Sequence, residues 1–164
     1  MTDPTSSPPD PRQARQYHPS RWRRAGDAVI SVFVRFGMVP STYLLTTRGR
    51  RTGRPLTHPV TVVEQDGRRW LVAPYGQVSW VRNARADARV RLGRRGDRRD
   101  YAVREVPPEE AGPVLKRYVG IATATRPYFQ ATKDSPVEHF VAEAVRHPVF
   151  ELLPISEDQP DGPG

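Results

Sequence analysis

Cysteine is absent from the 164-residue sequence, and histidine occurs only four times. Without cysteine the chain has no disulfide, no catalytic thiolate and no cysteine-ligated zinc or iron–sulfur centre. The histidines form no HxH or HExxH pattern, so we expect no metal site. A chain without disulfides also fits a reducing compartment, which favours the cytoplasm.

Long hydrophobic runs are also missing. The longest apolar stretch, AVISVFV at residues 28–34, ends at Arg35, whereas a membrane-spanning helix needs about 20 apolar residues. The N-terminal MTDPTSSPPDPRQ has no apolar core and does not resemble a signal peptide. We therefore expect a cytoplasmic protein without transmembrane segments.

Lysine is scarce, since Lys116 and Lys133 are the only two, and the net charge of +8 rests almost entirely on arginine. A basic chain favours an anionic partner, such as a nucleic acid, an anionic membrane surface or a phosphorylated or carboxylated ligand. A GC-rich genome also favours arginine codons, which accounts better for scattered arginines than for clustered ones. The clusters are therefore the informative part of the charge.

Residues 21–154 have the length of one domain, between a proline-rich arm at residues 1–20 and a tail at residues 155–164. Both flanks lack the apolar groups that would offset the entropy of ordering, so we predict disorder there. The domain begins with residues 21–39, whose apolar positions fall near one stripe and predict an amphipathic helix.

The rest of the domain reads as short strands joined by turns. β-Branched and aromatic runs such as TYLLTT and THPVTVVE, with the hairpin signal Asp66-Gly67, indicate antiparallel pairing. We predict strands at residues 42–47, 57–64, 69–74, 88–92, 99–105 and 147–153, and helices at residues 80–86, 107–119 and 137–146. This set favours a mostly antiparallel α+β fold, a split β-barrel with flanking helices.

The most informative segment is LLTTRGRRTGRPLTHP, at residues 44–59. Between two predicted strands it places two glycines and four arginines, which are Arg48, Arg50, Arg51 and Arg54. Glycine permits close backbone approach, successive amides can form an anion-binding nest, and guanidinium groups bind phosphate in pairs. The turn therefore favours an anionic ligand, although a solvated basic β-turn has the same composition.

A second segment, APYGQVSWVRN at residues 73–83, leads from a strand into a short helix. Trp80 and Asn83 are three residues apart and so share one face of that helix. Two interpretations stay open for the pair. Either Trp80 flanks a planar ligand and Asn83 binds a polar group on it, or Trp80 anchors the core and Asn83 caps local backbone.

These motifs, in this order, resemble the deazaflavin-dependent nitroreductase family, which includes F420H2-dependent quinone reductases. The resemblance rests on LLTTRGRRTGRP followed by HPV, on DGRRWLVAPYG and on WVRNARADARVRL. The C-terminal FQATKDSPVEHFVAEAVRHPVFELLP is similar to one actinobacterial branch. The match covers residues 43–154 and implies a relative of the flavin-binding split β-barrels that uses the 5-deazaflavin coenzyme F420.

The resemblance also implies how the cofactor is held. The turn would bind the phosphate and polyglutamate tail, the second strand would run beside the deazaflavin ring, and the segments after it would complete the pocket. The implied cofactor-binding residues are Arg50, Arg51, Thr52, Gly53, Arg54, Thr57, His58, Pro59, Val60, Thr61, Ala73, Pro74, Tyr75, Gly76, Ser79, Trp80, Arg82 and Asn83. Two features depart from one branch of the family: Leu56 stands where that branch has a basic residue, and the loop at residues 75–78 is shorter.

The activity implied by the resemblance is that of an F420H2-dependent oxidoreductase, whose cofactor supplies the hydride chemistry while the protein binds, orients and excludes water. The substrate would be an electron-poor small molecule, such as a quinone, an enone or a nitroaromatic. We assign no catalytic residue. Tyr75, Tyr128 and Phe129 are candidates for substrate stacking or proton delivery, with packing under a loop as the plainer role for each. Flavin-type split barrels often dimerise, and the analogy suggests a homodimer.

Other functions also fit parts of the sequence. The same barrel with FMN or haem is the alternative enzyme, with FMN as the alternative cofactor. The arginine run GRRGDRR at residues 93–99 suggests a nucleic-acid module, but it fits a solvated hairpin and no nucleic-acid-binding motif accompanies it, so we expect no nucleic-acid partner. Peripheral contact of the basic helix 21–39 with the inner membrane face is favoured over nucleic-acid binding, but less than packing of that helix across the barrel.

Overall fold

The computed structural model describes residues 41–155. The predicted arm, the predicted helix at residues 21–39 and most of the predicted tail lie outside the described residues. The strands are β1 (Thr42–Arg48), β2 (Pro55–Gln65), β3 (Arg68–Val72), β4 (Arg89–Arg94), β5 (Asp97–Glu105) and β6 (Val149–Pro154). The helices are α2 (Ser79–Ala86), α3 (Pro108–Ile121), the 3-10 helix η1 (Thr123–Tyr128) and α4 (Val137–Glu143).

The six strands close into an antiparallel barrel in the order β1-β2-β3-β6-β5-β4, and β4 pairs back to β1. Two tight turns explain part of this order. Asp66 and Gly67 join β2 to β3, Arg95 and Gly96 join β4 to β5, and their φ angles run from 52° to 86°. Positive φ at both central residues is the geometry of hairpin turns that match the twist of strands. The prediction of a split β-barrel with flanking helices is confirmed.

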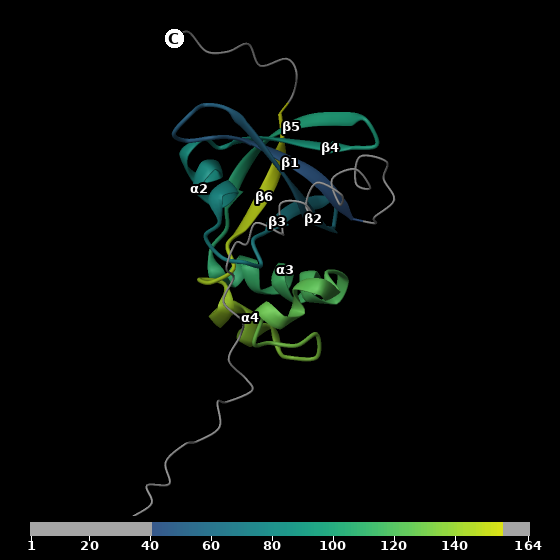
Figure 1. The fold of residues 1–164 in the computed structure, drawn as a ribbon. Helices are drawn as coiled ribbons and strands as arrows, with labels where there is room; N and C mark the ends of the chain where they lie inside the picture. The colour runs from purple at the N-terminus through teal and green to yellow at the C-terminus, as the bar shows by residue number, and fades with distance from the viewer. Residues whose placement is uncertain (1–40, 156–164) are drawn as a thin grey trace, which may run out of the picture.

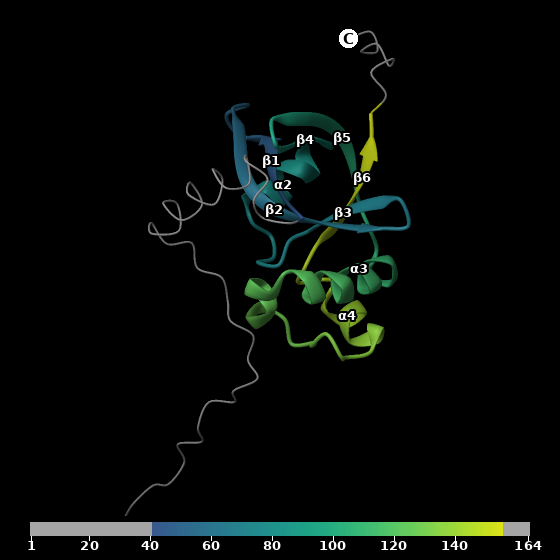
Figure 2. The ribbon, with the colours of Figure 1, turned by 90° about the vertical axis from the view of Figure 1, so that its right-hand side faces the viewer.

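Two apolar cores lie on opposite sides of the barrel wall. Inside the barrel, Leu45 and Leu71 pack with Trp80 of α2, so α2 closes the interior. Outside it, Trp70 of β3 packs with Phe140 of α4 and with apolar residues of α3. Figures 1 and 2 show α3 and α4 together on one side of the barrel, where they cover this second core.

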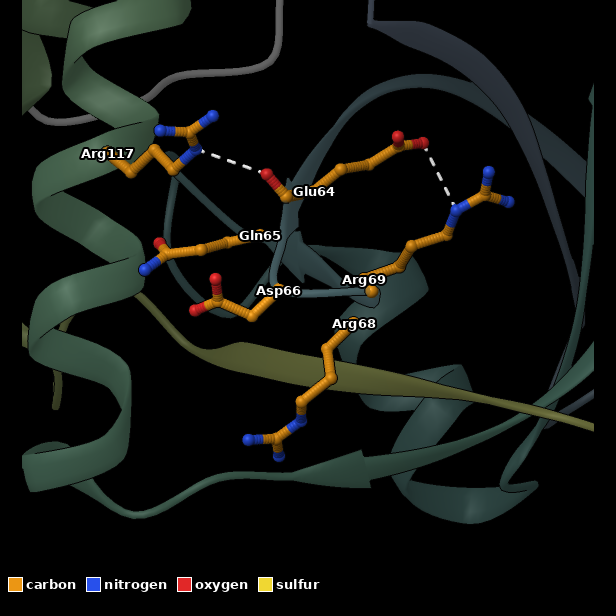
Figure 3. A pocket seen from close by; sticks show the side chains of 7 residues that line it. Glu64, Gln65, Asp66, Arg68, Arg69 and Arg117 are labelled. Atoms are coloured by element: carbon orange, nitrogen blue, oxygen red, sulfur yellow. Dashed lines mark hydrogen bonds and ion pairs between the residues drawn. The ribbon is translucent and has the colours of Figure 1, made fainter.

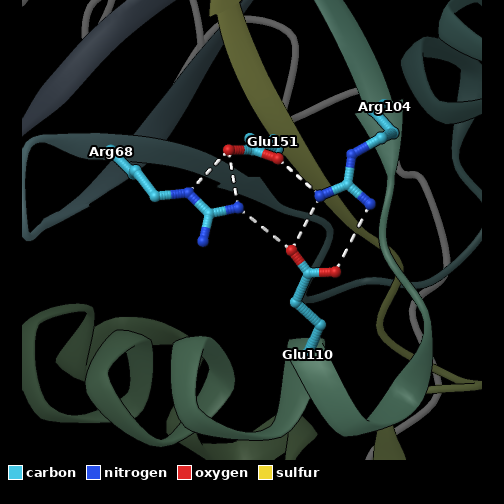
Figure 4. A network of polar contacts seen from close by, with 4 residues as sticks. All are labelled: Arg68, Arg104, Glu110 and Glu151. Carbon is cyan, nitrogen blue, oxygen red and sulfur yellow. Dashed lines mark hydrogen bonds and ion pairs between the residues drawn. The ribbon is translucent and has the colours of Figure 1, made fainter.

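A network of four charged side chains fastens α3 to the barrel (Figure 4). Arg68 of β3 and Arg104 of β5 each contact Glu151 of β6 and Glu110 of α3, at N···O distances of 2.5–3.1 Å. Hydrogen bonds from Arg68 to Glu151, and from Arg104 to Glu110, hold the pKa of each carboxyl group below its ordinary value. Two positive and two negative charges thus balance at the junction of three strands and a helix.

The elements differ from their predicted bounds mainly in the C-terminal third. α4 ends at Glu143, three residues before the predicted end, because the chain tightens into hydrogen bonds between residues three apart and then meets Pro148, whose ring disfavours helix in the residue before it. η1 was not predicted. Pro127 lies inside it, and a 3-10 segment of this length leaves no periodic apolar pattern in the sequence.

Candidate functional site

The arginine turn, residues 49–54, joins β1 to β2. The Gly49 N–H donates to the Arg54 carbonyl at 2.8 Å, and the Gly53 N–H donates to the Gly49 carbonyl at 2.7 Å. Gly53 has a φ of 69°, and a Cβ at Gly49 would lie 3.1 Å from the Arg54 carbonyl oxygen. The backbone therefore requires both glycines of the motif, independently of any ligand.

Asn83 of α2 holds this turn against the barrel. Its side-chain oxygen accepts hydrogen bonds from the Arg50 N–H at 3.3 Å and from the Arg50 guanidinium at 3.4 Å. Its amide nitrogen donates to the Thr47 hydroxyl at 3.2 Å. Asn83 is 1% exposed, so its hydrogen-bonding groups serve the protein's own backbone and side chains. Of the two interpretations, the structure gives Asn83 the role of a cap.

Trp80 takes the corresponding role of core anchor. It is 6% exposed, and its ring centroid lies 5.7 Å from that of Phe150 in β6. Ser79 and Arg82, the other predicted site residues of α2, lie on its exposed face. The buried face of α2 therefore contacts the arginine turn through Asn83, and its exposed face carries Ser79 and Arg82.

The turn offers fewer free amides than a complete anion nest would. Four of its six amides, those of Gly49, Arg50, Gly53 and Arg54, already donate within the protein. Among the residues that the structure describes, no partner reaches the amides of Arg51 and Thr52. Guanidinium groups therefore provide most of the capacity of this turn to bind an anion.

The three arginines of the turn and Arg48 at the end of β1 are exposed, and none of them pairs with a carboxylate of the described residues. Within residues 41–155, no ion pair reaches Arg48, Arg50, Arg51 or Arg54. Six arginines elsewhere in the barrel do pair with carboxylates, at 2.5–3.3 Å; they are Arg68, Arg69, Arg85, Arg91, Arg99 and Arg104. The turn thus gathers uncompensated positive charge, which attracts an anion.

The first half of β2 has a free edge beside this turn. β1 pairs with residues 55–61 of β2, whereas β3 pairs only with residues 62–65. The Val62 N–H donates to the Ser41 carbonyl on the β1 side, so the N–H groups of Thr61 and Thr57 point the other way, because successive residues alternate. Pro59 has no N–H and suits an edge. This edge offers the N–H groups of Thr57 and Thr61, which no described strand covers.

The side chains of the same half of β2 alternate between the two faces of the barrel wall. Val60 is buried inside the barrel, and His58 lies on the same face but is half-buried. Thr57 lies on the outer face, where its hydroxyl is 2.9 Å from that of Thr46. The predicted ring-binding segment is therefore ordered by its pairing with β1 while one edge stays open.

The loop of residues 73–76 follows β3 and lies against the chain after α4. The Ala73 N–H donates to the Pro148 carbonyl at 2.9 Å. Gly76 has a φ of 80°, and a Cβ there would lie 3.3 Å from the Arg146 carbonyl oxygen. Pro74 is buried, and Tyr75 is half-buried. The loop is thus fixed from below by residues 146–148.

Two of the three predicted substrate-side residues meet in the structure. The rings of Tyr75 and Tyr128 pack edge to face, with centroids 4.8 Å apart. Phe129 instead belongs to the core beneath the helices, where it is 7% exposed and stacks on His147 at 4.1 Å. The predicted residues therefore form three groups: the turn with Asn83, the first half of β2, and the loop with Tyr128. Phe129 has the plainer role of packing.

Sequence reasoning missed the side chains that hold the third group in place. Glu143 is 4% exposed, and its carboxyl oxygen lies 3.4 Å from Nε2 of His147. Burial lowers the pKa of His147, while Glu143 and the carbonyls of Pro74 and Ala73 act in the opposite direction. The four-residue spacing of Glu143 and His147 was the available signal, since side chains at this spacing are neighbours in a helical turn, and the two remain neighbours although α4 ends at Glu143.

A pocket of about 620 Å³ lies at the far end of β2 (Figure 3). It is lined by Glu64, Gln65, Asp66, Gly67, Arg68, Arg69 and Arg117. Its arginines are engaged within the protein, because Arg117 donates to the Glu64 carbonyl and Arg69 pairs with the Glu64 carboxylate. β2 has 11 residues, so the pocket lies about 30 Å from the arginine turn. We assign it no ligand.

The arginine run of the β4–β5 hairpin is partly compensated by nearby groups. Arg91 pairs with Asp100, Arg99 pairs with Asp97, and Arg94 lies over the ring of Tyr43 at 5.2 Å. In the described part of the chain, no group of three His, Asp or Glu side chains is placed to hold a metal ion. No described helix is both long and apolar enough to cross a membrane.

A model of the family described as F420H(2)-dependent quinone reductase matches residues 17–143. No curated protein matches the sequence. Among solved structures, one described as a domain-swapped dimer aligns with a TM-score of 0.52 and 22% identity, over 80% of this chain and 96% of that one. The haem storage protein HutZ from Vibrio cholerae aligns with a TM-score of 0.52 and 14% identity, over 74% and 86%.

A third structure, the F420-H2 dependent reductase FDR-A, aligns with a TM-score of 0.46 and 24% identity, over 69% of this chain and 94% of that one. Sequence identities below 25% do not show that this chain shares a ligand or a reaction with these proteins. The two alignments at 0.52 therefore concern the barrel fold alone.

Proposed function

The chain belongs to the F420H(2)-dependent quinone reductase family, and from that premise we propose that it reduces an electron-poor small molecule, with a quinone as the first choice and an enone or a nitroaromatic as others. Membership makes the protein an oxidoreductase that uses coenzyme F420. The proposal adds the class of acceptor and the residues that hold each partner.

The observation that carries this proposal is the uncompensated charge of the arginine turn. Arg48, Arg50, Arg51 and Arg54 are exposed and have no described carboxylate partner. F420 carries a phosphate and a polyglutamate tail, so its end is an extended chain of anions. Guanidinium groups bind phosphate and carboxylate in pairs. The donor set of the turn therefore fits the charged end of this cofactor.

The open edge of β2 is proposed to hold the ring end. Backbone groups of Thr57 and Thr61 face away from β1 and suit the polar rim of a flat heterocycle. The loop with Ala73 and Pro74 would close the other side. Both segments are fixed by the barrel, and a rigid support keeps a bound ring in one orientation.

The acceptor is proposed to bind beside Tyr75 and Tyr128. When bound, F420H2 supplies a hydride, and a quinone that gains a hydride also gains a proton to become a hydroquinone. Because the two tyrosine rings pack edge to face, the pair offers the acceptor both a ring face for stacking and a nearby phenolic O–H group. Either hydroxyl is suited to hold the proton that the acceptor takes up. These residues lie on the side of loop 73–76 that faces the helices.

A homodimer is also part of the proposal, on the analogy with flavin-type split barrels. The molar mass of the protein measured by light scattering should then be twice the 18.5 kDa of one chain. A mass of one chain at micromolar concentration would contradict it.

The experiment that tests the proposed function is a titration of the protein with F420, FMN, FAD and NADPH, followed by an F420H2-oxidation assay with menadione. We expect F420 to bind with a Kd in the micromolar range, roughly −8 kcal/mol, and FMN to bind far more weakly. Menadione should be reduced only when F420H2 is present. Tight FMN binding with no F420 binding would contradict the proposal and favour the flavin alternative.

A further inference from the structure

One short stretch of chain, residues 143–148, contacts both segments that carry the substrate-side tyrosines. Tyr75 lies in the loop after β3, and Tyr128 ends η1, 53 positions later in the sequence. Their rings meet edge to face at 4.8 Å. The loop of Tyr75 has no strand or helix hydrogen bonds to fix it, and η1 ends at Tyr128, so its short 3-10 ladder does not order the chain that follows. Residues outside both segments must supply that order.

Glu143 fixes the segment after Tyr128. One carboxyl oxygen accepts from the Ala131 N–H at 2.5 Å, and the other accepts from the Gln130 N–H at 3.2 Å. Arg146 adds a hydrogen bond to the side chain of Gln130 at 3.1 Å. Because one buried carboxyl group binds both amides, it fixes the conformation of the backbone at residues 130–131, just after η1.

His147 and its neighbours fix the loop of Tyr75. The imidazole stacks on Phe129 at 4.1 Å and lies 3.4 Å from the Glu143 carboxyl. The ring also lies near the carbonyls of Ala73 and Pro74, although no well-formed hydrogen bond reaches its Nδ1 from the described residues. The Pro148 carbonyl and the close approach to Gly76 hold the same loop by its backbone.

We propose that Glu143 and His147 are positioning residues, which set the relative placement of Tyr75 and Tyr128 for the acceptor. They touch neither the acceptor nor the cofactor, and they act through the two segments that they bind. The inference rests on the proposed function, because it takes the tyrosine pair to be the acceptor site.

The energetics favour this role over a purely stabilising one. A carboxyl group that is 4% exposed has lost most of its contact with water, and such burial is offset only when the group is fully hydrogen-bonded. Replacing a buried polar pair by apolar residues of similar volume is often neutral or stabilising. What an apolar pair would not provide is the fixed direction of two backbone amides and of an imidazole ring. The contribution of Glu143 and His147 is therefore the fixed orientation of these amides and of this ring.

The test compares Glu143→Gln and His147→Phe with matched controls on α4. Glu138 and His139 are the same residue types, both exposed, so Glu138→Gln and His139→Phe serve as controls. The first readout is NMR of protein with ¹³C-labelled tyrosine, in which Tyr75→Phe and Tyr128→Phe assign the two signals. We expect both signals to move in Glu143→Gln and His147→Phe and to stay in place in both controls.

The second readout is kinetic. For menadione, kcat/KM should fall about ten- to hundredfold in the two test variants, the range that displacement of a positioned group by about 1 Å gives. The Kd for F420 should stay within about twofold of the wild-type value, because the arginine turn is not touched. A residue needed only for folding would weaken cofactor binding and acceptor turnover together. If Glu143→Gln does not fold, His147→Phe, which keeps the stacked ring, provides the same comparison.

The outcomes separate the two proposals. Unmoved tyrosine signals, or an unchanged kcat/KM for menadione in an active protein, would overturn the positioning role and leave the proposed function intact. A wild-type protein that binds no F420 or reduces no menadione would overturn the proposed function, and the positioning role with it. Moved tyrosine signals together with a selective loss of acceptor turnover would support both.

Discussion

At the scale of single residues, Asn83 shows how the candidate site depends on a buried group that is hydrogen-bonded within the protein. Its buried amide satisfies the Arg50 N–H on one side and the Thr47 hydroxyl on the other. The contact fixes the root of the turn from which the arginines project. A side chain that seemed equally suited to a ligand thus organises the residues around it.

Replacing Asn83 by Ala should destabilise the protein by about 1–3 kcal/mol, because the Arg50 N–H and the Thr47 hydroxyl lose their buried partner. Urea unfolding measures the change. The F420 affinity should fall as well, since the turn loses its support. Ser79→Ala, on the exposed face of the same helix, should stay within about 0.5 kcal/mol of wild type. Equal stability and equal F420 affinity in Asn83→Ala would contradict the assigned cap.

The sequence identified Asn83 as a site residue but left its role open. Spacing places Trp80 and Asn83 on one helix face, yet it does not say whether that face meets a ligand or the protein. The deciding contact joins Asn83 to Arg50, 33 positions away. The two glycines of the turn were easier to interpret, because their requirement is local and follows from the backbone alone.

At the scale of elements, the junction of α3 with β3, β5 and β6 depends on Glu151. This carboxylate is 6% exposed and binds both Arg68 and Arg104. The two arginine side chains are about half exposed, so water weakens their electrostatic attraction to Glu151. The contribution of Glu151 should therefore lie above the roughly 0–1 kcal/mol of a surface ion pair and below the roughly 3–5 kcal/mol of a fully buried one.

The pH dependence of that contribution follows from the lowered pKa of Glu151, which the hydrogen bond from Arg68 causes first. A carboxyl group with a lower pKa in the folded state stabilises the fold above its unfolded pKa. That stabilisation is lost as the pH falls through the folded value. Glu151→Gln should therefore be less stable than wild type at pH 7, and the difference should shrink as the pH drops below about 4.3.

Urea unfolding of wild type and Glu151→Gln at several pH values measures this difference. Glu109→Gln is the matched control, since Glu109 is exposed in the first turn of α3 and has no ion pair among the described residues. A gap between wild type and Glu151→Gln that stays constant from pH 7 to pH 3 would contradict the linkage.

The elements themselves were mostly predictable. Alternating apolar residues and turn dipeptides such as Asp66-Gly67 place the strands to within about two residues, because both signals are local. The four-membered charge network was not predictable, since its members come from three strands and a helix. η1 was missed for a different reason: its hydrogen bonds are local, as from Arg126 to the Val119 and Gly120 carbonyls, but a short 3-10 helix leaves no periodic apolar pattern.

At the scale of the whole molecule, the positive charge is unevenly compensated. Carboxylates pair with Arg68 of β3, Arg91 of β4 and Arg104 of β5, whereas no described carboxylate pairs with the arginines of the turn between β1 and β2. An even spread of surplus arginine would point to composition alone. The turn between β1 and β2 and the tip of the β4–β5 hairpin, at Arg95 and Arg98, are both places where no described carboxylate pairs with the arginines, and the motif of the resemblance favours the first of them as the ligand site.

The closure of the barrel could be anticipated from the sequence only in part. Hairpin signals predict neighbours along the chain, but the pairing of β1 with β4 and of β3 with β6 joins distant segments. The ordered motifs of the resemblance supplied what the local patterns did not. The separate groups of site residues emerged only once those distant pairings brought them into place.

The most direct test of the account is the F420 Kd of Arg51→Ala/Arg54→Ala, compared with that of Arg95→Ala/Arg98→Ala, which removes the same charge from the exposed β4–β5 hairpin. If the arginine turn binds the charged end of the cofactor, the first double variant should lose about a hundredfold or more in affinity, at about 1.5–3 kcal/mol for each of the two charged groups. The second should stay within about threefold of wild type. Equal affinity in the two double variants would contradict the account.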